Sequence, residues 1–166
     1  MPDGPAPASG DRRFCICSIE LDEHTLVRRT RQIEQEREIA IYDLLEANSF
    51  RPEGSEGGPY KVVLRIEENR LAFDIRLEDD SAHRQVLLSL APFRKVVKDY
   101  FLICESYFKA IREAPLSHIE TLDMSRRSVH DEGSDLLVER LRGKVEVDRD
   151  TARRLFTLIC VLHLKG

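Results

Sequence analysis

The sequence predicts an α+β fold: an antiparallel sheet of about four to five strands, with four to five helices packed mainly on one of its faces. Between residues 60 and 111 the spacing of apolar side chains changes from every second residue to every third or fourth. The first spacing is typical of a half-buried strand, and the second is typical of a helix with one buried face. A chain of 166 residues fits one domain of this kind, which we assign to residues 14–166.

Two strands joined by a tight turn are predicted over residues 60–77. Their alternating apolar side chains are Tyr60, Val62, Leu64 and Ile66 in the first strand, and Leu71, Phe73, Ile75 and Leu77 in the second. This alternation predicts a hairpin with one buried and one solvated face, turning at Glu68-Asn69. Further short strands are predicted over residues 14–21, 86–90 and 144–147, and the proline- and glycine-rich segment 49–59 is predicted to be a long loop.

Helices are predicted over residues 30–48, 92–111, 118–129 and 149–163, with a continuation or restart of the third around Gly133. Ser117 and Glu120 match a capping box at the start of the third helix. The helix over 92–111 carries a wide apolar stripe, so we expect it to be the central helix of the domain. The last helix is apolar nearly all round beyond Arg154, which predicts deep burial or sharing with another subunit.

The composition argues against several classes of function. A formal net charge of −4 is unfavourable for non-specific nucleic-acid binding, which requires a basic face. No apolar run approaches the roughly 18 residues of a membrane span. Residues 1–13 lack the pattern of a secretory signal and are predicted to form a disordered lead-in. A cytoplasmic protein that contacts neither a membrane nor a nucleic acid is the expectation.

The cysteine pattern predicts no disulfide, metal or cofactor. Cys15 and Cys17 lie on one face of a predicted strand with Cβ atoms roughly 6–7 Å apart, too far for a disulfide. Cys104 and Cys160 fall within apolar helical patterns. We therefore predict core packing for all four cysteines, since the paired spacing of zinc ligands is also absent.

The densest cluster of polar functional groups lies between residues 123 and 133. The spacings of three, four and seven residues among Asp123, Arg126, Arg127 and His130 bring several of these side chains onto one face of a helix. Arg126, Arg127 and His130 together could hold a phosphate or a carboxylate, with Asp123 or Glu132 as further candidates. The alternative interpretation is an exposed, charged helix end that Gly133 terminates.

A second candidate set, Arg94, Lys95 and Lys98, opens the helix predicted over residues 92–111. Positive charge at a helix N-terminus is unfavourable, because the helix dipole is already positive there. Either an anionic partner or neighbouring carboxylates, such as Asp99 or those of residues 78–80, would compensate for it. We favour the neighbouring carboxylates.

Four segments resemble an established group of sequences. These are EGGPY over residues 56–60, PFRKVVKDYF over 92–101, HDEGS over 130–134 and DTARRLFTLICVLH over 150–163. They resemble uncharacterised protein family 0262, a group of small bacterial proteins chiefly from alphaproteobacteria, over about residues 14–166. The resemblance implies a bacterial lineage and a cytosolic location, and it implies no reaction or active-site residue.

Two functions from different classes follow from these observations. The first is a non-enzymatic protein-interaction or regulatory module, whose partner is another protein or a second copy in a homo-oligomer; the apolar last helix, the open sheet and the lack of a reactive motif support it. The alternative is a small-ligand protein that binds or handles a phosphoester, phosphate or carboxylate through Arg126, Arg127 and His130. DNA binding through a helix pair has less support, because the chain is acidic and shows no helix-turn-helix pattern.

Overall fold

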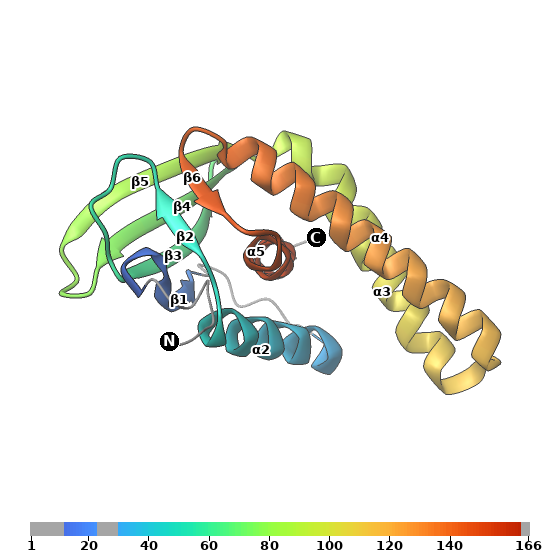
Figure 1. Ribbon diagram of the computed structural model, residues 1–166. Helices are drawn as coiled ribbons and strands as arrows, with labels where there is room; N and C mark the ends of the chain where they lie inside the picture. The colour runs from blue at the N-terminus through green and yellow to red at the C-terminus, as the bar shows by residue number, and fades with distance from the viewer. Residues whose placement is uncertain (1–11, 23–29, 164–166) are drawn as a thin grey trace.

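The computed structural model describes residues 12–22 and 30–163, and most of the predicted lead-in lies outside them. In chain order the elements are η1 Arg12–Phe14, β1 Ile16–Leu21, α2 Arg31–Glu46, β2 Phe50–Pro52, β3 Tyr60–Glu67, β4 Arg70–Leu77, β5 Ala82–Ser89, η2 Ala91–Phe93, α3 Arg94–Glu113, α4 Leu116–Leu141, β6 Val145–Val147 and α5 Arg149–Leu162. The predicted α+β class is confirmed (Figure 1).

The main sheet has the order β1-β3-β4-β5 and is mixed. The predicted hairpin is confirmed: β3 and β4 pair antiparallel from Tyr60 opposite Leu77 to Glu67 opposite Arg70. Its turn residues, Glu68 and Asn69, have φ values of 46° and 68°, which suit the tight turns that join twisted strands. The prediction of a fully antiparallel sheet is wrong, because β1 pairs parallel with β3. The chain leaves β1, passes through α2 and returns in the same direction, as a crossover connection requires.

A second, two-stranded sheet joins β2 to β6 in antiparallel pairing. The strand predicted over residues 144–147 is therefore present, but its neighbour lies in the segment predicted to be an irregular loop. Phe50, which pairs with Val147, is fully buried despite the polar composition around it. α5 begins directly after β6, so this two-stranded sheet leads into the start of α5.

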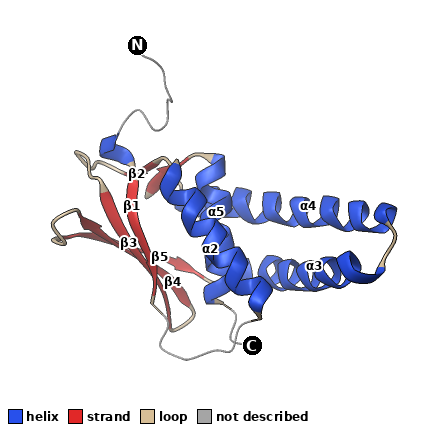
Figure 2. Cartoon of the chain, turned by 90° about the horizontal axis from the view of Figure 1, so that it is seen from below, coloured by secondary structure: helices blue, strands red, loops and turns tan. Residues whose placement is uncertain are grey.

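The helices form two groups (Figures 1 and 2). α2 and α5 lie against the sheet, whereas α3 and α4 form a helical hairpin that projects beyond it. The prediction that the helices pack mainly on one face of the sheet therefore holds for α2 and α5 but not for the α3–α4 hairpin.

The central helix is α5 rather than α3, which corrects the prediction. From Thr151 to Val161 every residue of α5 is buried except Arg153 and Arg154. In α3, by contrast, Leu102 and Ile111 remain 54% and 51% exposed. The same chain covers α5, so this helix needs no second subunit to bury it.

α4 is one continuous helix, and Gly133 does not end it. Gly133 is buried inside α4, and a Cβ atom at this position would overlap the ring of Phe156 in α5. The glycine therefore allows close approach of two helices. The predicted capping box is also absent: Pro115 occupies the N-cap position and Ser117 lies within the first turn.

The side chain of Asn48 connects the end of α2 to β1 through hydrogen bonds. Its Oδ1 accepts a hydrogen bond from Ile16 N at 2.7 Å, and its Nδ2 donates to Ile16 O at 3.0 Å and to Leu44 O at 2.8 Å. These bonds satisfy buried backbone groups at the end of α2 and the start of β1. They hold the C-terminal end of α2 against the start of β1.

The cysteines follow the prediction only in part. Cys104 and Cys160 are buried, and burial raises the pKa of Cys104 to about 11, so the thiol stays protonated. Cys17 is exposed, so the prediction of core packing is wrong for it. The register between β1 and β3 shifts between Ile16 and Ser18, which makes Cys17 the additional residue of a β-bulge and turns it away from the core.

Candidate functional site

Polar side chains from each of the four α-helices that the structure describes meet where α2 approaches the α3–α4 hairpin. This interhelical cluster consists of Glu36 in α2, Tyr100 in α3, Arg126 and His130 in α4, and Thr157 in α5. The Tyr100 hydroxyl donates to Glu36 Oε1 at 3.2 Å, and Arg126 Nη1 lies 3.7 Å from the same oxygen. His130 Nε2 and Thr157 Oγ1 are 3.2 Å apart. The cluster therefore connects α2 to the hairpin through side chains.

Arg126 is held in this cluster by contacts on several sides. Its guanidinium lies 4.7 Å from the centre of the Tyr107 ring, and its Nη2 lies 3.5 Å from Asp123 Oδ1. Burial alone would lower the pKa of Arg126, but the charge of Glu36 and other neighbours outweighs burial and the pKa is raised. Its Nε is buried without an acceptor among the described residues. Arg126 is thus a charged group with one donor left unused.

Arg127 and Glu132 lie away from the cluster. The Arg127 side chain is 71% exposed and pairs with Asp123 Oδ2 at 3.0 Å, and Glu132 is exposed. Successive residues of a helix point in different directions, so adjacent arginines cannot both face inward. Of the predicted set, the structure brings Asp123, Arg126 and His130 to the inner side of α4.

His130 is surrounded by aromatic rings and cations. Its ring centre lies 5.0 Å from that of Tyr100 and 6.2 Å from that of Phe156. Burial, together with the positive charges of Arg153 and Arg126, lowers the pKa of His130 to about 4. The imidazole is therefore neutral at pH 7 and contributes a hydrogen-bonding group rather than a charge.

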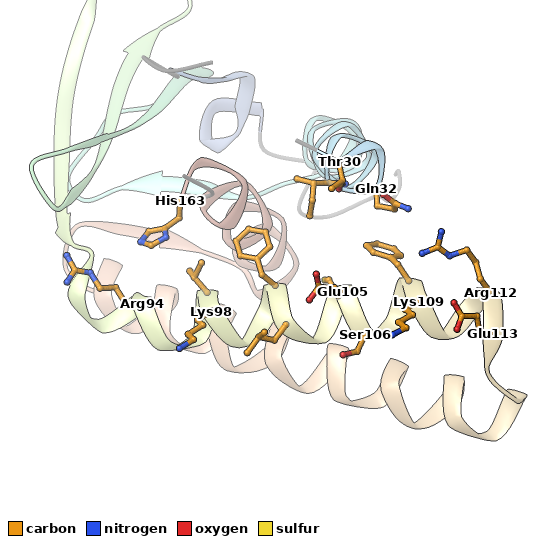
Figure 3. Close-up of a pocket in the computed structure, with 16 residues that line it drawn as sticks. Thr30, Gln32, Arg94, Lys98, Glu105, Ser106, Lys109, Arg112, Glu113 and His163 are labelled. Atoms are coloured by element: carbon orange, nitrogen blue, oxygen red, sulfur yellow. The ribbon is translucent and has the colours of Figure 1, made fainter. Parts of the chain in front are cut away.

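A second feature is a groove of about 1040 Å³ along α3, which we call the α3 groove (Figure 3). Across from α3 it is bordered by Thr30 and Gln32 at the start of α2 and by His163 after α5. Apolar side chains line it, namely Ile33, Val97, Phe101, Leu102 and Phe108. Charged residues also line it: Arg94, Lys98, Glu105, Lys109, Arg112 and Glu113.

The three basic residues predicted at the start of α3 have different surroundings. Arg94 donates to Asn69 Oδ1 at 3.0 Å, and Lys95 pairs with Asp99 at 2.9 Å, as expected for compensation by a neighbouring carboxylate. Lys98 forms no ion pair with any described residue. Arg94 and Lys98 line the α3 groove, whereas the Lys95 side chain is 82% exposed outside it.

The described residues offer neither a metal site nor a membrane-spanning helix. Within residues 12–22 and 30–163, no three His, Cys, Asp or Glu side chains are grouped so that they could hold a metal ion. In the same part of the chain, no helix combines the length and the apolar character needed to cross a bilayer.

Comparison with known proteins gives the lineage. The model of an uncharacterised protein family, UPF0262, matches residues 13–165. The chain belongs to UPF0262. A UPF0262 protein of Nitrobacter winogradskyi is 58% identical over 160 residues, which cover 96% of each chain. One from Rhodospirillum rubrum is 58% identical over 151 residues, covering 91% of this chain and 93% of the relative. No solved structure matches.

Sequence reasoning missed several residues that shape these sites in this UPF0262 protein. Glu36 lies three residues after Ile33 and four before Ala40, both buried, so the helical period already placed it toward the inner face. Lys109 and Arg112 follow Lys98 by eleven and fourteen residues, which are close to whole numbers of turns. This spacing was the available signal for a basic edge along α3.

Proposed function

We propose that this UPF0262 protein is a non-enzymatic protein-interaction module, and that its α3 groove binds an acidic amphipathic helix of a partner. The observation that carries the proposal is the combination of an apolar groove with three basic side chains that form no ion pair among the described residues. These are Lys98, Lys109 and Arg112. The lining carries four basic side chains, Arg94 among them, and two acidic ones, Glu105 and Glu113. In a chain with a net charge of −4, this local excess of positive charge favours an anionic partner.

The dimensions of the groove suit a helix. From Lys98 to Arg112 the axis of α3 rises about 21 Å, which is four turns of a partner helix laid alongside it. Helices that bind in grooves bury apolar residues at every third or fourth position and keep polar residues at the edges. Leu102, which is 54% exposed, provides apolar surface between the basic residues for such a contact.

Peptide binding tests this proposal. We expect a fluorescently labelled amphipathic helical peptide, with leucines on one face and glutamates beside them, to bind the wild-type protein at low salt. The double variant Lys98→Glu, Arg112→Glu should bind it about 10- to 100-fold more weakly, because two attractive contacts become repulsive. Fluorescence anisotropy measures both affinities.

The matched control is Arg140→Glu with Lys144→Glu, which changes the net charge equally at exposed positions outside the groove. It should reduce binding little. Equal loss in both double variants would show a general charge effect. Equal binding of a peptide in which lysine replaces every glutamate would also contradict the proposal.

A second candidate function is the binding of a small phosphate or carboxylate at Arg126. The specific observation is the buried Nε without an acceptor, beside carboxylate contacts of 3.5 and 3.7 Å, which are longer than a charge-assisted hydrogen bond. If the site is real, millimolar inorganic phosphate should raise the melting temperature of the wild type. Arg126→Ala should abolish the shift, while Arg127→Ala, at the exposed neighbour, should retain it. Identical responses of the two variants would remove this candidate.

A further inference from the structure

The outer face of α2 carries an exposed apolar stripe. Ile39, Tyr42 and Leu45 are 49%, 66% and 42% exposed, and their spacing of three residues places them along one side of the helix. Glu38 and Glu46 lie beside them, are exposed and form no ion pair with described residues. We call these five residues the outer α2 stripe. It is itself an acidic amphipathic surface on a helix.

The outer α2 stripe and the α3 groove are complementary. The stripe presents apolar side chains between two unpaired carboxylates, and the groove presents apolar side chains beside Lys98 and Lys109. Along their helices Glu38 and Glu46 are about 12 Å apart, and Lys98 and Lys109 about 16 Å. Long, flexible lysine side chains can cover this difference.

The two surfaces occupy different parts of one molecule. The groove is bordered by the start of α2, at Thr30 to Ile33, whereas the stripe extends over its second half. The stripe of one copy therefore cannot dock in the groove of the same copy, because the start of α2 already forms one border of that groove and the stripe continues along the same helix away from it. A second copy can do so.

We infer that the acidic helix that docks in the α3 groove is α2 of a second copy of this chain, an inference that rests on the proposed function of the groove. Each copy carries one groove and one stripe, so a two-fold arrangement uses both surfaces twice and closes without a third subunit. The contact would cover Tyr42 and Leu102, two of the large apolar side chains that a single copy leaves exposed.

A charge exchange tests this inference. We expect the wild-type mass, measured by light scattering and sedimentation over a wide concentration range, to rise from 19.2 kDa toward twice that value. The groove variant Lys98→Glu, Lys109→Glu and the stripe variant Glu38→Lys, Glu46→Lys should each remain monomeric at concentrations where the wild type associates. In each variant the groove and the stripe carry the same sign of charge.

An equimolar mixture of the two variants should associate again. The acidic groove of one variant then faces the basic stripe of the other, and the unchanged basic groove faces the unchanged acidic stripe. Circular dichroism and thermal melting show that each variant is folded, which is expected because all four positions are exposed.

Three results would overturn self-association through these surfaces: a wild type that stays monomeric, variants that associate as the wild type does, or a mixture that stays monomeric. The proposed function fails by a different observation, because it concerns peptide binding. The wild type could stay monomeric and still bind the acidic peptide, while the groove variant loses peptide binding. That result would exclude a second copy as the partner and would still support the groove as a docking site.

Discussion

Replacing Gly133 by alanine is expected to destabilise the protein by about 2–4 kcal/mol, although alanine favours helices over glycine by about 1 kcal/mol. The added methyl group would overlap the end of the Phe156 ring. That ring is fully buried and makes edge contacts with Tyr100 at 6.0 Å and His130 at 6.2 Å between ring centres. Because the ring is enclosed, relief of the overlap requires α4 and α5 to separate.

Urea unfolding of Gly133→Ala measures this loss, with Glu132→Ala as a control at the adjacent exposed position of the same helix. A double-mutant cycle with Phe156→Leu isolates the contact. In the Phe156→Leu background the alanine should cost much less than in the wild type, since the smaller side chain leaves room for it. Equal costs in both backgrounds would mean that Gly133 is needed for another reason.

The sequence predicted the elements whose apolar spacing is set locally. The hairpin of β3 and β4 could be predicted because eight apolar residues alternate with other residues on either side of Glu68-Asn69. The burial of α5 could be predicted because apolar side chains occur on all sides of this helix. These patterns depend only on neighbours along the chain.

The elements that were predicted wrongly depend on contacts between distant segments. β1 pairs parallel with β3, a strand that follows it only after α2, and Asn48 joins β1 to the end of α2 across 32 residues. Gly133 was interpreted as a helix end because glycine weakens helices locally. Its actual role is visible only when Phe156 lies opposite.

The candidate sites show the same division. The helical period alone predicted that several of Asp123, Arg126, Arg127 and His130 share one face of a helix, and the structure places all of them except the exposed Arg127 on the inner side of α4. It could not provide Glu36 or Thr157, because these partners come from α2 and α5 and reach the cluster only after those helices dock. The α3 groove likewise has walls from two helices far apart in sequence.

Acidification is expected to destabilise the protein through His130. Folding lowers the pKa of this group from its ordinary value of 6.5 to about 4, chiefly by burial and by the charges of Arg153 and Arg126. The charge of Asp131 raises the pKa, but by less than these effects lower it. Between these two values the unfolded chain binds more protons than the folded one, so stability falls as the pH decreases from about 6.5 to about 4. At about 1.4 kcal/mol for each pKa unit, the loss is on the order of 3 kcal/mol.

Urea unfolding at a series of pH values measures this slope for the wild type and for His130→Gln. Glutamine can retain a hydrogen bond to Thr157 but does not titrate, so its stability profile should be flatter between pH 6.5 and 4. His118→Gln is the matched control, because His118 is exposed on the same helix and its removal should leave the wild-type slope unchanged. Carboxylates titrate near the lower end of this range in all three proteins, so the difference between profiles, rather than either profile alone, reports His130. If His130→Gln and the wild type lose stability in parallel, folding does not lower the pKa of His130 and the prediction is wrong.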